Sequence, residues 1–438
     1  MIPIRQLVSL LPALFFPFAL AGAQVRSPSA QQPPGPRVSP PREPGSELTV
    51  TLLTMGVGEE VWEQFGHNAL WFHVERPAVI GGPVDVVYNW GIFDSSQPYF
   101  IPHFLQGRML YSMGGYPYQE TLIEYRQRDR AVWAQELDLT NAQKIALRDF
   151  VLWNSRPENA YYRYDYFRDN CSTRVRDALD RVLGGVIKAT YSGRTTPYTY
   201  RSETLRLTQV GPLLATGIDI GLGRPADHQL SEYEDMFLPM RLRDDIRGLR
   251  IPDGHGGTRP LVKDERMLLG TISHQEPTAP PNWMPLFLTI GVLLAVLFGV
   301  IGWRAARGSA PARFAAATVY AIFSFIFGFL GVLLTLLWTV TDHTFAYRNE
   351  NLLLFNPLWL LLAVLVPMTA VKGRLSSTTR WLTFILAGLA FVALLLHLVR
   401  LSHETNGVII ALVLPPMLAM AWAVYHGTAH SRRRAVEG

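Results

Sequence analysis

Cysteine is almost absent from this chain, whose 438 residues include only one, Cys171. One cysteine cannot form an intramolecular disulfide bond, so disulfides are excluded as a source of stability. The eleven histidines form no His-Glu-x-x-His pattern, and no cysteine pair is available for a metal. The sequence also contains no glycine-rich phosphate-binding motif. We therefore expect no metal and no cofactor, and any chemistry must come from the side chains.

Charged residues are also scarce, at 17% of the chain, and the net charge is +5. The arginines are scattered or flank apolar segments, and they do not form a single basic stretch. This distribution is typical of a protein whose basic residues set its membrane topology and meet anionic lipid headgroups. A membrane is therefore an expected partner and nucleic acid is not.

The N-terminus resembles an export signal. Arg5 precedes an apolar run from Leu7 to Leu20, and Ala21-Gly22-Ala23 provides a small-x-small cleavage site. We predict a signal sequence over residues 1–23, with an uncleaved first membrane helix as the alternative. Both interpretations place the following segment outside the cytoplasm.

Composition divides the rest of the chain. A proline-rich linker is expected over residues 24–47, a globular domain over 48–273 and a second proline-containing linker over 274–283. A membrane domain follows over 284–426, and a basic tail over 427–438 ends the chain.

The membrane domain contains five apolar stretches, each close to the roughly 20 residues that cross a bilayer as a helix. They are Met284–Trp303, Phe314–Val340, Leu352–Val371, Trp381–Leu398 and Val408–Tyr425. Basic residues concentrate in alternate loops and in the tail, as the positive-inside rule requires of cytoplasmic segments. We therefore expect five helices, with the globular domain on the extracytoplasmic side. Pro357, Pro367, Pro415 and Pro416 are expected to kink the third and fifth spans.

The globular domain is predicted to be α+β. Its first part contains segments rich in β-branched and aromatic residues, and its later part contains helix-capping signals. Strands are expected at Leu48–Thr54, Ala69–Val74 and Val84–Trp90, and helices from Thr140 to Asn154 and from about Asn170 to Gly184.

Cys171 is expected at the N-terminus of a helix, where free N–H groups and the helix dipole lower a thiol pKa and can hold an oxyanion. Asp169, Asn170 and Ser172 are expected to cap and support this helix end, while Arg168 and Arg174 add positive charge. These features make Cys171 a candidate nucleophile, and an inert buried thiol is the alternative.

A thiol nucleophile requires a base, and His67 is the best candidate because it follows a glycine at the start of a predicted strand. Asn89, on the next strand, is our choice for the residue that orients the imidazole. Asp94 and Glu63 remain alternatives. His73, on the same strand face as His67, is expected to be a surface residue.

Three segments together resemble the Lnb family of bacterial lipoprotein N-acyltransferases. They are Gly66–Leu70, Tyr88–Asp94 and Tyr164–Arg174, and the membrane half adds Asp342-His343 and Asn349–Leu358. The resemblance implies a circularly permuted papain-like, NlpC-related domain in the periplasm, followed by a five-helix domain in the bacterial inner membrane. It also implies Cys171 as nucleophile and His67 as base. The related lecithin:retinol acyltransferases use a second histidine as orienting residue, where this chain has Asn89.

The implied activity is transfer of a fatty acyl chain, through a cysteine thioester, from a phospholipid to the N-terminal amine of diacylglyceryl lipoproteins. His343 and Asn351 lie in predicted outer loops, where they are candidates for substrate binding or ordinary helix caps. A cell-wall amidase or cysteine peptidase is the first alternative, and a non-enzymatic envelope assembly protein is the second.

Overall fold

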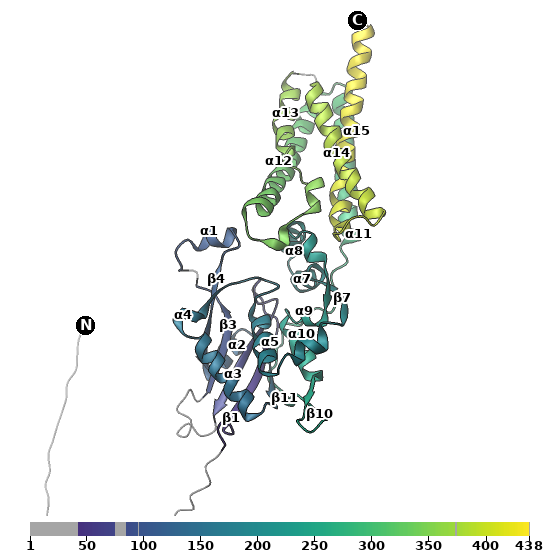
Figure 1. Ribbon diagram of the computed structural model, residues 1–438. Coiled ribbons are helices and arrows are strands. Elements are labelled where there is room, and N and C mark those ends of the chain that lie inside the picture. The colour runs from purple at the N-terminus through teal and green to yellow at the C-terminus, as the bar shows by residue number, and fades with distance from the viewer. Residues whose placement is uncertain (1–42, 75–84, 95, 373–374, 438) are drawn as a thin grey trace, which may run out of the picture. The chain divides into compact units, whose positions relative to one another are not determined.

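The computed structural model describes residues 43–74, 85–94, 96–372 and 375–437, which belong to one unit that begins at Glu43 (Figure 1). The predicted signal sequence over residues 1–23, and the predicted linker up to residue 42, lie outside the described residues. In this unit, a mixture of strands and helices extends to β11 (Val262–Leu269), and only helices follow from Met284 onward.

The globular domain is built on a seven-stranded sheet of order β11-β5-β1-β2-β3-β4-β6, in which every neighbouring pair is antiparallel. The α+β prediction is thus confirmed, as are its three strands. The strands are β1 Leu48–Met55, β2 His67–Val74, β3 Asp85–Ile92, β4 Leu110–Pro117, β5 Val132–Leu137, β6 Tyr161–Arg163 and β11 Val262–Leu269. β1 is buried along almost its whole length because it lies between two other strands and under helices.

Helices cover both faces of the sheet (Figure 1). On one face, α3 (Asn141–Asn154), α5 (Cys171–Val182) and α10 (Pro239–Gly248) share a buried core with the strands. On the other face, Tyr118 of α2 (Tyr118–Gln127) stacks on Trp71 with ring centroids 4.0 Å apart. The predicted helix at Thr140 is confirmed, and Thr140 and Gln143 form the expected capping box.

Short elements complete the domain around these layers. The helices are α1 Phe100–Leu105, α4 Pro157–Ala160, α6 Val186–Tyr191, α7 Tyr200–Thr208, α8 Pro212–Gly221, η2 Arg224–Asp227 and α9 Glu232–Asp235. Two small hairpins pair β7 (Thr195–Thr199) with β8 (Gln229–Ser231), and β9 (Arg250–Pro252) with β10 (Thr258–Pro260).

The C-terminal domain is helical. Among the described residues, four helices are long and apolar enough to cross a membrane, and the fifth apolar helix is shorter. The long helices are α11 Met284–Ala306, α12 Ala310–Val340, α14 Ser377–Leu398 and α15 Gly407–Glu437. They run alongside one another (Figure 1) and expose many large apolar side chains, as expected of a surface that faces lipid.

The predicted third span, Leu352–Val371, is wrong in its extent. Its helix, α13, covers only Trp359–Lys372, and the preceding residues form the 3-10 helix η4 (Glu350–Leu353) and a turn. Pro357 therefore precedes α13 and does not kink it, because a residue before proline disfavours helical geometry and Asn356 caps the turn through the N–H of Leu358. Pro367, Pro415 and Pro416 do lie inside α13 and α15, as predicted.

Loops of the helical domain contact the globular domain. Asp342 pairs with Arg108 at 2.9 Å and with Arg163 at 2.6 Å. Asn349 donates from Nδ2 to the carbonyl oxygens at the end of α8, at 2.8 Å for Ile220. The loops after α12 and after α14 therefore lie on the side of the helical domain that faces the sheet.

Candidate functional site

Cys171 is the first residue of α5, as predicted, and Asn170 is the N-cap. The Oδ1 atom of Asn170 accepts hydrogen bonds from the N–H groups of Ser172 and Thr173, each at 2.9 Å. Its Nδ2 atom donates to the carbonyl oxygens of Tyr166 and Phe237 at 2.9 and 3.0 Å. Asn170 thus closes the helix end and fixes the loop that precedes the thiol.

The side chains expected to support the helix end at Cys171 each have partners of their own. Asn170 occupies two helix-end N–H groups itself, and Asp169 forms an ion pair with Arg174. The Ser172 hydroxyl is buried, 2.8 Å from Asn68 Oδ1 and 2.7 Å from the Met236 carbonyl oxygen. These side chains hold the helix end in place, so stabilisation of an oxyanion would fall to backbone N–H groups.

The electrostatics of the thiol differ from the prediction. Burial raises the pKa of Cys171 above its usual value, although the N–H groups of Asn68, Ser172 and Cys171 and the charge of Arg130 act in the opposite direction. Burial in turn lowers the pKa of His67 to about 4, against the effect of its bond to Asn89. At neutral pH the pair is therefore a neutral thiol and a neutral imidazole, a combination in which the imidazole is free to accept a proton.

His67 and Asn89 meet across neighbouring strands. His67 begins β2, Asn89 lies on β3, and the His67 Nε2 atom is 3.0 Å from Asn89 Oδ1. Asn89 Nδ2 donates to the Val87 carbonyl oxygen at 3.1 Å, which fixes the amide so that its oxygen faces the histidine. Nε2 then carries the proton, and Nδ1 remains as the nitrogen that can act as a base.

Two features bring the helix end to these strands. Asn68, next to His67, donates from Nδ2 to Thr54 Oγ1 at 2.8 Å. Its Oδ1 atom accepts a hydrogen bond from the Ser172 hydroxyl on α5. Gly91 has φ +86°, and a Cβ atom there would lie 3.5 Å from the Cys171 Cβ atom. Glycine at this position both permits the left-handed backbone and leaves the space beside the thiol open.

The alternative orienting residues lie elsewhere. Glu63 is buried against Arg128 and Arg130, whose Nη1 atom is 3.4 Å away. Asp94 accepts from the N–H and hydroxyl of Ser96 at 2.8 and 2.6 Å. Among the described residues, Asn89 is thus the one of the three candidates that bonds to His67. His73 is half-exposed and faces Asp85 at 3.6 Å, in agreement with a surface residue.

Sequence reasoning missed Arg130, whose positive charge affects the pKa of both Cys171 and His67. Its guanidinium is buried and donates twice to the Gly56 carbonyl oxygen, at 3.0 and 2.8 Å. Its charge acts to lower the pKa of both Cys171 and His67. No local pattern identifies such a residue, because Arg130 lies in the loop before β5 and reaches the site only through the tertiary fold.

A row of aromatic rings, also not predicted, leads from the surface toward the thiol. Trp62 is 60% exposed and its ring centroid is 6.3 Å from that of Phe93, which is 5.9 Å from that of Tyr111. Tyr111 stacks on Tyr164 at 4.1 Å. Tyr164 lies 3.7 Å from where a Cβ atom of Gly91 would stand, next to Cys171. This aromatic row thus extends from exposed Trp62 to the residues beside Cys171.

The predicted substrate-binding residues fall into two groups. Asn351 is buried, where Asn406 Nδ2 donates to its Oδ1 atom at 3.0 Å, and Arg174 pairs with Asp169 and lies over the Tyr162 ring. Both are thus engaged in holding the fold. His343 contacts the Phe104 carbonyl oxygen at 3.1 Å and stacks near Tyr166, while Arg168 is exposed over the Phe345 ring.

In the described part of the chain, no group of three or more histidine, cysteine, aspartate or glutamate side chains has a geometry suited to a metal ion.

Comparison with known families gives two matches. The model of the Lnb N-terminal periplasmic domain matches residues 44–205, and that of the Lnb transmembrane domain matches residues 278–426. The first match contains His67, Asn89 and Cys171, and the second contains all the apolar helices. Comparisons with curated proteins and with solved structures gave no match.

Proposed function

Because the chain belongs to the Lnb family of membrane proteins with a periplasmic N-terminal domain, we propose that it is a thiol-dependent acyltransferase. Its proposed reaction moves a fatty acyl chain from a phospholipid ester to the N-terminal amine of diacylglyceryl lipoproteins at the bacterial inner membrane. The observation that supports this most is the His67–Asn89 pair beside the helix end that carries Cys171, in a domain joined to apolar helices.

The first half-reaction forms the thioester. His67 Nδ1 takes the proton of the Cys171 thiol as the sulfur attacks the ester carbonyl carbon, and the N–H groups of Asn68 and Cys171 stabilise the oxyanion. The intermediate then expels the lysophospholipid alkoxide, which takes the proton from His67. A Cys171 thioester and a lysophospholipid are the products.

The second half-reaction consumes the thioester. The lipoprotein amine attacks the thioester carbonyl carbon, and His67 accepts a proton from the nitrogen. When the intermediate collapses, the C–S bond breaks and the proton returns to the Cys171 sulfur. The amide product and the resting thiol result, so no oxidant, metal or external proton source is required.

In this proposal the domain is a circularly permuted relative of the papain-like enzymes. His67 and Asn89 precede Cys171 in the chain, and they lie on antiparallel strands against which the nucleophile helix packs. The aromatic row from Trp62 to Tyr164 would hold the acyl chain of the thioester, because apolar rings next to the thiol exclude water that would otherwise hydrolyse it.

The test is mass spectrometry of lipoprotein N-terminal peptides from a host depleted of its own N-acyltransferase. The host expresses either this protein or its Cys171→Ala variant at a matched level in the membrane. We expect an N-acyl chain only with the intact thiol. If neither form adds an acyl chain, the proposed substrate is wrong. Release of muropeptides by the unaltered protein alone would instead favour a cell-wall amidase, and full cellular function of Cys171→Ala would favour an assembly role.

A further inference from the structure

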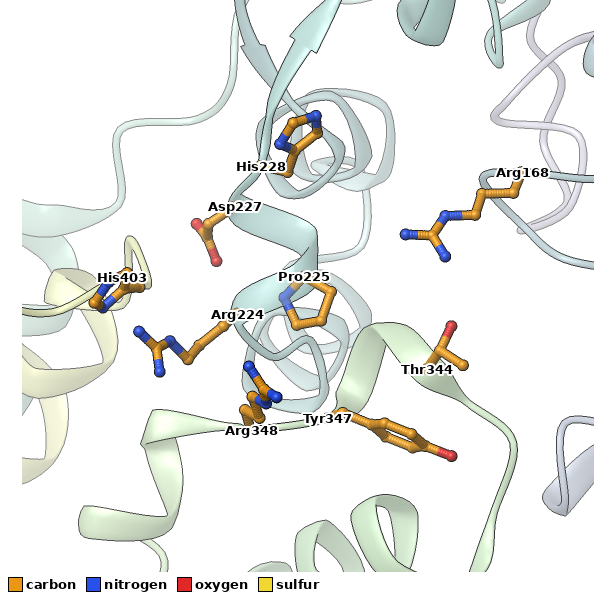
Figure 2. A pocket seen from close by; sticks show the side chains of 9 residues that line it. All are labelled: Arg168, Arg224, Pro225, Asp227, His228, Thr344, Tyr347, Arg348 and His403. Carbon is orange, nitrogen blue, oxygen red and sulfur yellow. The ribbon is translucent and has the colours of Figure 1, made fainter.

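A second site lies where the globular domain meets the loops of the helical domain. It is an open pocket of about 600 Å³, a volume within the range of small-molecule sites, roughly 300–1,000 Å³ (Figure 2). Its lining comes from the segment before Cys171, from η2 and its C-terminal neighbour, and from the loops after α12 and α14. The lining residues are Arg168, Arg224, Pro225, Asp227, His228, Thr344, Tyr347, Arg348 and His403.

Three arginines line this pocket, and two of them have no acidic partner among the described residues. Among the described residues, the guanidinium groups of Arg168 and Arg348 have no carboxylate within ion-pair distance, and Arg168 is placed over the ring of Phe345. Arg224 forms an ion pair from its Nε atom to Glu350 Oε1 at 3.4 Å, and the same oxygen lies 3.8 Å from His403 Nδ1. In Figure 2 Arg224 extends toward His403 with Arg348 close to it in the view, and Arg168 extends from the opposite side of Pro225.

The one acidic side chain of the lining, Asp227, bonds to partners other than the three pocket arginines. Asp227 bonds to the Nε atom of buried Arg201 at 2.9 and 3.1 Å through its two oxygens, and it also accepts from the Thr405 hydroxyl at 2.7 Å. It therefore does not serve as a counterion for the pocket arginines. Arg168 and Arg348 thus bring two guanidinium groups without an acidic partner to a concave site, which favours binding of an external anion.

Backbone conformation supports a specific role for Arg348. It has φ +54°, in the left-handed region that non-glycine residues seldom adopt. Both chain neighbours of Arg348 are held in place. The hydroxyl of Tyr347 donates to the Thr341 carbonyl oxygen, and Asn349 is buried and donates to the end of α8. The loop thus keeps a strained arginine at the pocket instead of a glycine.

We propose that this pocket binds the phosphodiester group of a membrane phospholipid. Arginine guanidinium groups form paired, charge-assisted hydrogen bonds with phosphate oxygens, and two or three of them can surround one phosphate. The loops that supply Arg348 and His403 follow the apolar helices α12 and α14, which places the pocket beside the helix ends where lipid headgroups lie.

Arg168 connects this pocket to the thiol, since it is three residues before Cys171 in a loop fixed by Asn170. A phospholipid held by its phosphate at this pocket is therefore suited to act as the acyl donor. That donor role rests on the proposed function, whereas phosphate binding itself does not.

The experiment uses the full-length chain with Cys171→Ala, purified in a neutral detergent, so that no turnover can occur. Native mass spectrometry measures binding of phosphatidylglycerol and of a galactosyl diacylglycerol with the same acyl chains but no phosphate. We expect phosphatidylglycerol to bind about tenfold more tightly, and Arg224→Gln together with Arg348→Gln to remove this preference. Arg400→Gln is the matched control, because Arg400 is also an exposed loop arginine with positive φ (+55°) but does not line the pocket.

Each other outcome decides against the proposal. Equal binding of the two lipids, or an equal loss of preference in Arg400→Gln, would show that no phosphate site exists here. Binding of inorganic phosphate that depends on Arg224 and Arg348, without any preference between the lipids, would assign the site to free phosphate and overturn the lipid headgroup as its source. Because binding is measured without catalysis, a failed acyltransferase assay leaves this result unaffected.

Discussion

At the scale of single residues, the proposed chemistry depends on a half-buried thiol, Cys171, and a half-buried imidazole, His67. The pKa of Cys171 is raised and that of His67 is lowered to about 4, in both cases first of all by burial. We therefore predict that alkylation of Cys171 by iodoacetamide accelerates with pH around a midpoint above the usual thiol value of about 8.5. Since Cys171 is the only cysteine, the alkylation rate reports on this thiol alone.

The directions of these two pKa shifts follow from the effect of burial on the charged form of each group. Burial disfavours both the thiolate and the imidazolium, so the resting site holds a proton on sulfur and none on His67 Nδ1. His67→Ala should leave the midpoint high, because the imidazole is uncharged and supplies no positive field. A midpoint below about 7 in the unaltered protein would instead reveal the preformed thiolate expected from the helix end alone.

The proposed role of Asn89 in orienting His67 can be tested by substitution. Asn89→Ala removes the acceptor of the His67 Nε2 proton, so the ring can rotate or change tautomer. We expect acyl transfer about tenfold to a hundredfold slower, because a buried polar group left without its partner costs about 1–3 kcal/mol. Asn89→Asp keeps the acceptor but adds a negative charge that raises the pKa of His67, so the acidic limb of its pH–rate profile should move to higher pH. Glu124→Gln, at an exposed position on α2, is the control and should change neither quantity.

At the scale of elements, the strands and helices that carry the site were predictable, and their neighbours were not. β1, β2 and the helix at Thr140 have strong local signals, namely β-branched residues and a capping box. β4 has none, because Gly114 and Gly115 weaken its strand pattern. A Cβ atom at Gly115 would stand 2.8 Å from Val86 and 3.1 Å from Tyr88, so glycine serves close packing on β3. Only the assembled sheet explains such a residue.

The third apolar stretch shows a different limit of sequence reasoning. Leu354 and Phe355 are buried among the other apolar helices, and the Trp359 indole donates to the Leu354 carbonyl oxygen at 3.1 Å. These residues are hydrophobic because they pack in a protein core, whereas hydropathy alone assigns them to a helix in lipid. The candidate site shows the same division: local motifs predicted His67, Asn89 and Cys171, whereas Arg130 and the aromatic row depend on contacts between distant segments.

At the scale of the whole molecule, a buried charge network joins the two domains. Arg201 on α7 is fully buried and bonds to Asp219 at 2.6 Å and to Asp227 at 2.9 Å. Its Nη2 atom also lies 3.6 Å from Glu404, in the loop between α14 and α15. Burial raises the pKa of Glu404 to about 8, with Arg201 acting in the opposite direction. The contact between the domains therefore includes a carboxyl group that is protonated at neutral pH.

This network makes the stability of the protein depend on pH in a defined direction. The pKa of Glu404 is about 8 in the folded protein and near 4.5 when the chain is unfolded, so the folded state binds the proton more tightly. Its contribution to stability is complete below pH 4.5 and is lost as the pH rises through 8. Thermal unfolding of the full-length protein in detergent should therefore show a lower midpoint at pH 9 than at pH 6.

Glu404→Gln separates this contribution from those of other buried carboxyl groups, since glutamine has the shape of the protonated side chain and does not ionise. The decrease in unfolding midpoint between pH 6 and pH 9 should be smaller in Glu404→Gln than in the unaltered protein, by about 2 °C or more. Glu276→Gln is a fitting comparison, because Glu276 also pairs with a buried arginine, Arg206 at 2.7 Å, but within the globular domain and its linker. An equal decrease in all three proteins would mean that Glu404 is ionised in the folded state. In that case Glu404 and Arg201 would form a true buried ion pair between the domains, and removing either partner would destabilise the protein by leaving the other charge uncompensated.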